Sequence, residues 1–140
     1  MSEFREDGWH SYPVRVYYGD TDAAGVVYYA NYLDIAERGR TEMLRLAGIP
    51  HAAMVEKEGV YFAVRRAEID YLRPAKLDDL LDVRSKLVHM GGASLEVRQE
   101  VRRDDACLVT LSVKLACVKS AGGPARIPSQ VAERLRAFLT

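Results

Sequence analysis

Residues 29–47 carry the one long helical pattern in a chain whose other apolar stretches alternate as strands do. Apolar side chains recur there at three- and four-residue spacings, which gives a helix with a single apolar face. The residues on that face are Tyr29, Tyr32, Leu33, Ala36, Met43, Leu44 and Ala47. Asn31 followed by Asp34 resembles a capping box, so we expect the helix to begin between residues 29 and 31. Gly48 and Pro50 should end it.

Five further segments are predicted to be strands, four because they alternate apolar and polar residues and residues 60–72 because they are rich in β-forming residues. They cover residues 12–18, 60–72, 80–89, 95–101 and 107–117. Short turns join the last three, so these three should form an antiparallel meander. Residues 51–59 are typical of a loop or short helix, and residues 128–139 of a terminal helix. The predicted fold class is α+β: a long central helix wrapped by a five-stranded antiparallel sheet, in a single domain spanning residues 1–140.

The composition excludes some classes of partner. The chain has 20 Lys and Arg against 20 Asp and Glu, so it lacks the basic excess of a dedicated nucleic-acid binder. It has no run of 18 apolar residues for an integral membrane segment, and its start, MSEFREDGWH, lacks the apolar core of a signal peptide. Cys107 and Cys117 lie about 33 Å apart along one predicted strand and cannot bridge each other. We therefore expect a cytoplasmic protein with free thiols.

A single helix cannot cover both faces and both edges of five long strands. Uncovered sheet edges tend to pair with another chain, and a net charge near zero favours self-association. The sequence therefore predicts a homodimer or homotetramer.

The densest group of reactive and turn-forming residues is the segment YYGDTDAAGVVYYAN at 17–31. A calcium loop counted from Asp20 would need oxygen ligands at Ala24 and a carboxylate at Asn31, and both positions fail. A structural turn held by the aspartates remains open. So does a catalytic site, in which a carboxylate such as Asp22 acts on a carbonyl whose oxygen is held by the N–H groups of the following helix.

The stretch from residue 14 to residue 44 resembles the hotdog-fold acyl-CoA thioesterases. The resemblance is carried by the signature YxDTDxxGVVYxxxY and continues through VRRAEIDYLRPAKLDDLLDV at 64–83 and GGASLEVRQEV at 91–101. More narrowly, the chain is similar to the 4-hydroxybenzoyl-CoA thioesterase superfamily and its YbgC-like (Tol–Pal-associated) branch. The resemblance implies a hotdog fold, hydrolysis of the thioester of small acyl-CoAs to free acid and CoA, and no metal or other cofactor.

The resemblance also implies roles for particular residues. Asp22 corresponds to the catalytic carboxylate, acting as nucleophile or general base, whereas Asp20 is expected to be structural. The backbone N–H of Tyr29, at the helix start, would polarise the thioester carbonyl. Many YbgC-like members have His at the position of Tyr29, so this chain lacks that side chain and retains only the backbone role.

Five further residues are expected to bind substrate: Gly25, Val26, His89, Ser94 and Arg65. Gly25 and Val26 belong to the signature, and His89 and Ser94 flank the turn at 91–92, which lies near the ligand in the family. Arg65 is one of several basic residues that could hold the phosphates of CoA, because a guanidinium binds phosphate with two hydrogen bonds.

Two rival interpretations concern other residues. Another hotdog class uses a helix carboxylate, for which Glu37 and Glu42 are the candidates here, although their periodicity places both on a solvated face. The tyrosines of the 17–32 segment are expected to be mostly core or interface aromatics.

Two alternative functions also remain: a hotdog module that binds acyl-CoA without turnover, and a thioesterase acting on acyl-carrier-protein thioesters.

Overall fold

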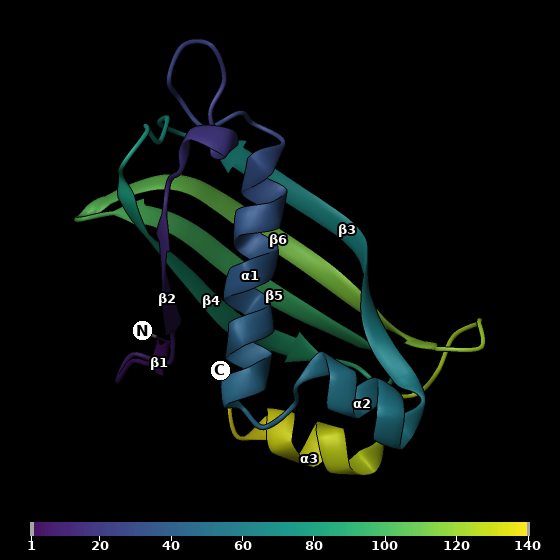
Figure 1. Cartoon of the computed structure of the whole chain (residues 1–140). Helices are drawn as coiled ribbons and strands as arrows, with labels where there is room; N and C mark the ends of the chain where they lie inside the picture. The colour runs from purple at the N-terminus through teal and green to yellow at the C-terminus, as the bar shows by residue number, and fades with distance from the viewer. Residues whose placement is uncertain (1, 140) are drawn as a thin grey trace.

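The computed structural model describes residues 2–139 and places one long helix across the face of a curved antiparallel sheet (Figure 1). The helices are α1 (Asn31–Leu46), α2 (His51–Glu58) and α3 (Ser129–Arg136), with a 3-10 turn η1 (Tyr18–Asp20). The strands are β1 (Glu3–Phe4), β2 (His10–Arg15), β3 (Val60–Tyr71), β4 (Leu80–Met90), β5 (Ser94–Arg103) and β6 (Ala106–Lys119). The predicted α+β class and central helix are therefore confirmed.

The strand order in the sheet is β1-β2-β4-β5-β6-β3. The predicted meander of β4, β5 and β6 is present, and both cysteines lie on β6 as free thiols. The prediction of five strands is wrong by one. The sixth is β1, which pairs through Glu3↔Ser11 and Phe4↔His10. A strand of two residues is too short to show an alternation in the sequence.

Strand β3 lies at an edge of the sheet, although β4 follows it in the chain. It pairs only with β6, and its other edge has no strand partner among residues 2–139. Its side chains from Val64 to Tyr71 are almost all exposed, in contrast to the alternating burial of β4, β5 and β6. The strand is 12 residues long. An open edge of this length presents unpaired backbone N–H and C=O groups with which a strand of another chain can pair.

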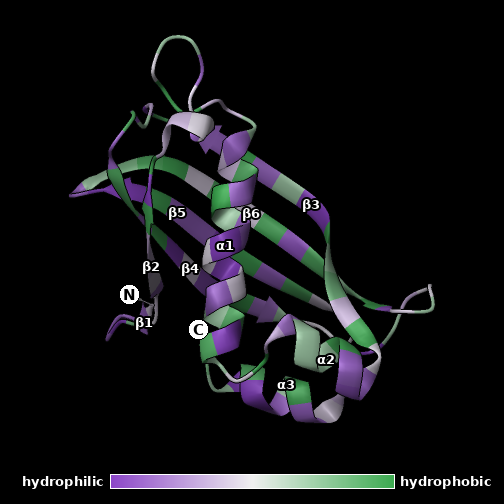
Figure 2. Ribbon diagram, viewed as in Figure 1, coloured by the Kyte–Doolittle hydropathy of each residue, from purple (hydrophilic) through white to green (hydrophobic). Residues whose placement is uncertain are grey.

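The hydrophobic core fills the space between α1 and the concave face of the sheet, where green apolar bands alternate with purple polar ones along each strand (Figure 2). The buried helix residues are Tyr32, Ile35, Ala36, Gly39, Arg40, Met43 and Leu44. The predicted stripe is therefore wrong at Tyr29 and Leu33, which are 62% and 47% exposed. Tyr29 precedes the helix, and Leu33 lies just outside the arc of α1 residues that are buried.

Gly39 lets the middle of α1 approach the sheet closely. A Cβ at this position would lie 2.3 Å from Cγ1 of Val83 on β4, which is far inside van der Waals contact. The close approach brings the backbone carbonyl of Ala36 against Gln99, whose Nε2 donates to it at 2.8 Å. Gln99 is fully buried and also accepts from the guanidinium of Arg40 at 3.2 Å. The polar groups under the helix are thus bonded to one another.

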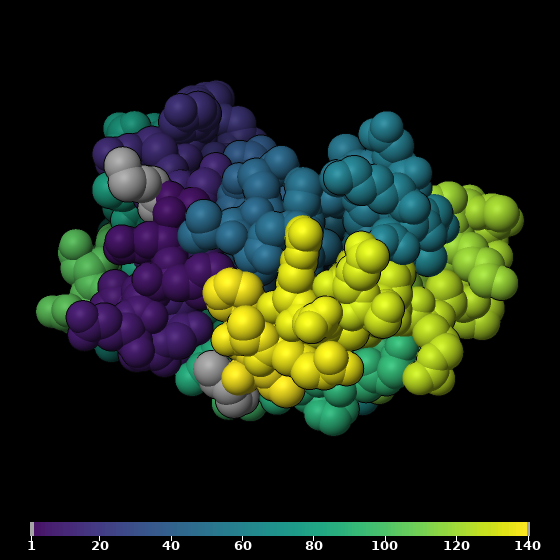
Figure 3. Space-filling view, turned by 90° about the horizontal axis from the view of Figure 1, so that it is seen from below, coloured from purple at the N-terminus to yellow at the C-terminus, as the bar shows by residue number. Residues whose placement is uncertain are grey.

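Helices α2 and α3 close the end of the molecule at which α1 terminates (Figure 3). Gly48 follows α1 with a φ of 88°, and the guanidinium of Arg134 on α3 donates to its carbonyl at 2.6 Å. The C-terminal segment also meets the N-terminus, because the rings of Phe4 and Phe138 stack at 4.4 Å. No helix among residues 2–139 is long and apolar enough to span a bilayer.

His10 on β2 is the most deeply buried titratable group of the N-terminal region, with 0% exposure. Its Nδ1 has no hydrogen-bond partner among the described residues, and its Nε2 is bonded to the hydroxyl of Ser2. Burial lowers the pKa of His10 to about 4, although Glu42 on α1 and Asp82 on β4 act in the opposite direction. The folded protein therefore holds His10 neutral.

Acidification is expected to destabilise the fold through His10. The unfolded chain binds a proton at this residue near pH 6.5, whereas the folded chain does so only near pH 4. Stability should therefore fall as the pH drops through this window and level off below it. The total loss is on the order of 3 kcal/mol, at about 1.4 kcal/mol per pKa unit.

Urea unfolding at pH 7 and pH 4.5 measures this effect when the wild type is compared with His10→Gln. The variant should lose clearly less stability on acidification. Burial also lowers the pKa of His51, but both proteins contain His51, so its contribution cancels. An equal loss in the two proteins would show that His10 is not the responsible group.

Candidate active site

The loop between β2 and α1 is fastened to the segment that connects β3 and β4. Val27 is 4% exposed and donates its N–H to the carbonyl of Ala75 at 2.8 Å. The N–H of Leu77 donates to the carbonyl of Gly25 at 3.2 Å. The N–H of Ala75 in turn donates to the hydroxyl of Tyr32. Burial raises the pKa of this hydroxyl. The loop therefore has a defined position over the start of α1, where it projects from the body (Figure 1).

Asp22 occupies the tip of a short hairpin within this loop. Its N–H donates to the carbonyl of Val26, Gly25 donates back to its carbonyl, and Thr21 bridges to Val27. One carboxylate oxygen, Oδ1, accepts the N–H of Ala24 at 2.8 Å. The side chain is exposed, so the carboxylate has oxygen lone pairs free to meet a ligand. Gly25 has a φ of 78°, which suits a residue without Cβ at this turn.

The backbone N–H of Tyr29 lies two residues before Asn31, the first residue of α1. Among residues 2–139 no acceptor binds the N–H groups of Tyr29 and Ala30, whereas the next three residues are bonded within the first turn. The 16 residues of α1 run away from this point, so the partial positive charge of the helix N-terminus reinforces both N–H groups. These free donors can hold an oxygen that gains negative charge during a reaction.

The predicted capping box is wrong. Ala30 is the N-cap residue, and no side chain caps the helix. Instead, the side-chain amide of Asn31 donates to the carbonyl of Asp20 at 2.9 Å, and Tyr28 donates to the same carbonyl at 3.0 Å. The carboxylate of Asp20 accepts the N–H of Tyr17 at 2.8 Å. Asp20 therefore fastens both ends of the loop.

Tyr71, at the end of β3, is a site residue that the sequence patterns did not indicate. Its hydroxyl donates to the backbone carbonyl of Tyr29 at 3.2 Å. Its ring also contacts the rings of Tyr29 and Tyr32, with centroids 6.3 and 5.7 Å apart. The edge strand is thereby tied to the start of α1. Tyr71 falls inside a segment that resembles the family, but only the folded contact reveals its partner.

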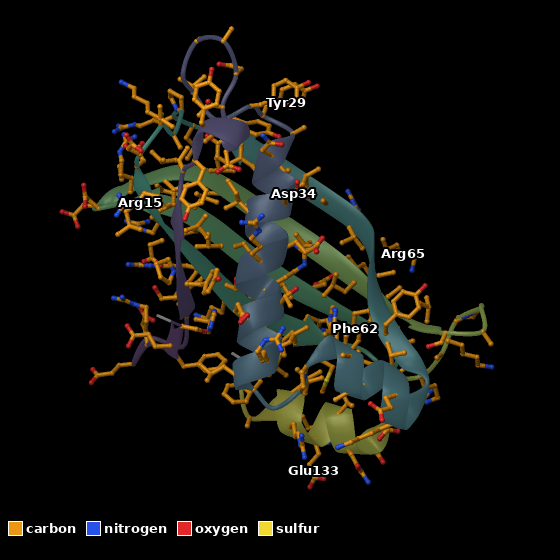
Figure 4. The ribbon with its side chains drawn as sticks, in the orientation of Figure 1. Arg15, Tyr29, Asp34, Phe62, Arg65 and Glu133 are labelled. Atoms are coloured by element: carbon orange, nitrogen blue, oxygen red, sulfur yellow. The ribbon has the colours of Figure 1, made fainter. Side chains whose placement is uncertain are left out.

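One chain does not bring the remaining predicted residues to this loop. His89 lies near the far end of β4, and Ser94 opens β5 beside it. The strand between the loop and His89 spans roughly 30 Å at about 3.3 Å per residue. Arg65 lies partway along β3, well away from Tyr29 (Figure 4), at a bulge between Val64 and Arg66. Asp22, Gly25 and Val26 lie together in the hairpin, and Tyr29 follows them on the same loop. His89, Ser94 and Arg65 lie on strands away from this loop.

The exposure and ion pairs of the helix carboxylates and loop tyrosines can be compared with the predictions made for them. Glu42 binds Arg45 within α1 at 3.2 Å, and Glu37 is exposed. Glu37 matches the solvated face expected for it, whereas the Glu42 side chain is only partly exposed, at 25%. Of the tyrosines expected to be mostly core or interface aromatics, Tyr32 lies in the core. The other members of the segment are exposed in the single chain, so their place in an interface stays a prediction. These are Tyr17, Tyr18, Tyr28 and Tyr29, at 70%, 83%, 46% and 62%. Among residues 2–139, no three His, Cys, Asp or Glu side chains could hold a metal together.

The architecture is shared with solved structures. The crystal structure of a probable thioesterase from Bartonella henselae superimposes with a TM-score of 0.83 at 38% identity, over 86% of this chain and 99% of that one. A hypothetical protein from Thermus thermophilus gives a TM-score of 0.86 at 28% identity, over 91% and 98%. A long helix held against an antiparallel sheet in this way is the hotdog fold, as predicted.

The sequence comparisons agree with the structural ones. The model of the thioesterase-like superfamily matches residues 16–135. The acyl-CoA thioesterase YbgC of Haemophilus influenzae is 45% identical over 112 residues, which are 80% of this chain and 82% of that protein. The chain belongs to the thioesterase-like superfamily, and its similarity to YbgC confirms the resemblance to that branch.

Proposed function

We propose that this protein is a cytoplasmic acyl-CoA thioesterase that hydrolyses small acyl-CoAs to the free acid and CoA. One observation carries the proposal: the start of α1 has an unbonded N–H at Tyr29, and the exposed carboxylate of Asp22 stands on the same loop. An electrophilic carbonyl between them would meet a nucleophile or base on one side and an oxyanion donor on the other. The similarity to the YbgC acyl-CoA thioesterase supports the substrate class.

Two routes fit this arrangement. As nucleophile, a carboxylate oxygen of Asp22 attacks the thioester carbon, the carbon–sulfur bond breaks, and the thiolate leaves and takes a proton from water. Water then hydrolyses the resulting anhydride and regenerates the carboxylate. As general base, Asp22 takes a proton from a water molecule that attacks the same carbon. The carbon–sulfur bond then breaks, and the protonated Asp22 returns the proton to the leaving thiolate. In both routes the N–H of Tyr29 stabilises the developing oxyanion.

We also propose that the active unit is a homodimer joined along β3. Two copies of β3 that pair about a two-fold axis run antiparallel. The Val60 end of one copy then lies beside the Tyr71 end of the other. The end of the sheet that carries His89 and Ser94 in one subunit is thereby moved toward the loop of its partner. The alternative assembly is a homotetramer made of two such dimers.

The test of the function is thiol release from a panel of short aliphatic, long-chain and aromatic acyl-CoAs. Turnover with at least one small acyl-CoA is expected. Tight binding of acyl-CoA without thiol release from any of them would instead indicate a binding module. Turnover of acyl-carrier-protein thioesters in preference to the matching acyl-CoAs would favour the carrier protein as substrate.

A further inference from the structure

The hydroxyl of Tyr71 meets the first peptide of α1 from the neighbouring end of β3. Figure 1 shows this strand ending beside the start of the helix, and the hydroxyl donates to the backbone carbonyl of Tyr29 at 3.2 Å. The same carbonyl accepts a longer bond, of 3.4 Å, from the N–H of Tyr32 in the first turn of the helix. Among residues 2–139, Tyr71 is therefore the closer of the two donors that hold this carbonyl.

The carbonyl of Tyr29 and the N–H of Ala30 belong to one peptide unit. This unit is planar and trans, so its C=O and its N–H point in opposite directions. Because the carbonyl accepts from Tyr32, it points along α1. The N–H of Ala30 therefore faces outward, where no acceptor among residues 2–139 binds it. A bond to the carbonyl fixes the tilt of the whole plane, so Tyr71 sets the direction of a donor that it does not touch.

The usual capping contact of a helix start is missing at this peptide. Ala30 is the N-cap residue, and no side chain accepts an N–H of the first turn. The side chain of Asn31 donates to the carbonyl of Asp20 instead, and the N–H of Tyr28 donates to the same carbonyl. The loop therefore fixes the residues on both sides of the peptide, whereas the peptide itself depends mainly on Tyr71.

The side chain of Tyr71 has a defined position, although the residue is 47% exposed. Its ring packs against the ring of Tyr32 at 5.7 Å and meets the ring of Tyr29 edge-on at 6.3 Å. Tyr32 is a firm support, because it is 3% exposed and its hydroxyl accepts the N–H of Ala75. The backbone of Tyr71 is paired with Val109 on β6. The strand and the ring contacts together hold the hydroxyl against the carbonyl.

A donor on the carbonyl also changes the charge on the N–H of the same peptide. Hydrogen bonds that form a chain polarise one another, by about 10–30% per bond. Here the chain would run from the hydroxyl of Tyr71, through the peptide, to an oxygen bound by the N–H of Ala30. The gain is greatest when that oxygen carries the charge of an oxyanion. It should therefore lower the reaction barrier more than it strengthens substrate binding.

We propose that Tyr71 is a positioning residue of the thioesterase site. Its hydroxyl orients and polarises the peptide between Tyr29 and Ala30, so that the N–H of Ala30 binds the developing oxyanion together with the N–H of Tyr29. This inference rests on the proposed function. It adds a second oxyanion donor and the residue that aims it.

Tyr71→Phe is the first test, because it keeps the ring and removes only the hydroxyl. With a small acyl-CoA we expect kcat to fall about threefold to tenfold, the effect of one lost neutral hydrogen bond, while KM stays within about twofold. Tyr12→Phe is the matched control, since Tyr12 is half-buried on β2 and its hydroxyl makes no hydrogen bond with the described residues. It should change neither constant. An unchanged kcat in Tyr71→Phe would overturn the proposal, and so would a loss that lies in KM alone.

A backbone substitution tests the donor itself. Incorporation of lactic acid at position 30 during cell-free translation replaces the N–H of Ala30 by an ester oxygen and keeps the methyl group. This N–H has no acceptor among the described residues, so no bond of the helix is lost. We expect kcat to fall by about 10²–10³, the range for loss of one oxyanion donor.

In the ester protein, Tyr71→Phe should lower kcat by less than about twofold further, because the donor that Tyr71 aims is already gone. Independent losses that multiply in the double variant would contradict a role for Tyr71 through this peptide. A wild-type kcat in the ester protein would show that the N–H of Ala30 is not an oxyanion donor.

Infrared spectroscopy reads the donors directly. The Asp22→Asn protein, which is expected to turn over slowly, is loaded with an acyl-CoA that carries ¹³C in the thioester carbonyl. Hydrogen bonding should lower the stretching frequency of this carbonyl. Addition of Tyr71→Phe should make the shift smaller, and addition of Tyr12→Phe should leave it unchanged. An equal shift with and without the hydroxyl of Tyr71 would contradict polarisation through the peptide.

The two proposals fail in different ways. If the wild type releases no thiol from any acyl-CoA, the proposed function is wrong, and the role of Tyr71 falls with it. If the wild type is active but Tyr71→Phe behaves like Tyr12→Phe, the function stands and only the role of Tyr71 is wrong.

Discussion

Asp22→Asn is expected to lower kcat for acyl-CoA hydrolysis by about 10² to 10⁴, the range for removal of a general base. The substitution removes the negative charge and the basicity, but the amide oxygen of Asn can still accept the N–H of Ala24 that the carboxylate now binds. The hairpin should therefore keep its shape, and KM should change little. Thiol release under saturating substrate measures kcat, and circular dichroism checks the fold.

Asp20→Asn is the matched control, because it is the same substitution two residues away on the same loop. The carboxylate of Asp20 accepts the N–H of Tyr17, and an amide oxygen can replace it there. This variant should retain activity within about tenfold of wild type, because the residue holds the loop and does not meet the substrate. Near-wild-type turnover by a folded Asp22→Asn protein would show that Asp22 is not the catalytic carboxylate.

The route of hydrolysis can be read from the label that the protein acquires. A single turnover in ¹⁸O water places the isotope in the Asp22 carboxylate if an anhydride forms and water attacks the carboxylate carbon of Asp22. Attack on the acyl carbon, or a general-base route, places it only in the product acid. Label found in Asp22 therefore establishes a nucleophile, and mass spectrometry of the peptide containing residues 17–31 detects it.

Val64→Lys is expected to convert the protein from dimer to monomer and to lower kcat/KM for acyl-CoA by about 100-fold or more. Val64 is 52% exposed in the single chain, so a lysine there should leave the monomer fold intact. In a dimer paired along β3 the same position would be buried against the partner strand, and burial of an unpaired charge costs several kcal/mol. Light scattering coupled to gel filtration measures the mass.

Val55→Lys provides the comparison, because it makes the same change at a valine of α2 that is 41% exposed. It should remain dimeric and active. A Val64→Lys protein that stays dimeric with wild-type turnover would rule out β3 as the interface. A monomer that keeps full activity would show that one chain contains the whole site.

The sequence predicted the parts of the fold that depend on local periodicity. The alternation in residues 80–117 was sufficient for the meander, and the helical spacing was sufficient for α1. It could not indicate that β3 crosses to the far edge and pairs with β6, because alternation reports which face of a strand is buried and not which strand lies beside it. Burial of Arg40 was missed for a related reason, since its partner Gln99 is 59 residues away in the chain.

The candidate site was predictable where its residues are contiguous. The signature at 18–32 contains Asp22, Gly25 and Val26, which lie together in one hairpin. Tyr29 was indicated by its position at the helix start, and it follows this hairpin on the same loop. The binding of Asn31 to Asp20 and of Tyr71 to Tyr29 depends on backbone carbonyls that only the folded loop presents. His89, Ser94 and Arg65 stay predictions, because the single chain does not bring them to this loop.

The hydrogen bond between Tyr71 and the carbonyl of Tyr29 has a thermodynamic consequence. Tyr71 belongs to the open edge strand, and Tyr29 carries the donor proposed to bind the thioester oxygen. If subunit pairing at this edge favours the Tyr29 geometry that binds ligand, the ligand must favour pairing by the same factor, because such coupling is reciprocal. The dissociation constant of the dimer should then fall as acyl-CoA is added. Dilution, which separates the subunits, should lower the affinity for substrate at protein concentrations where the chain is still folded.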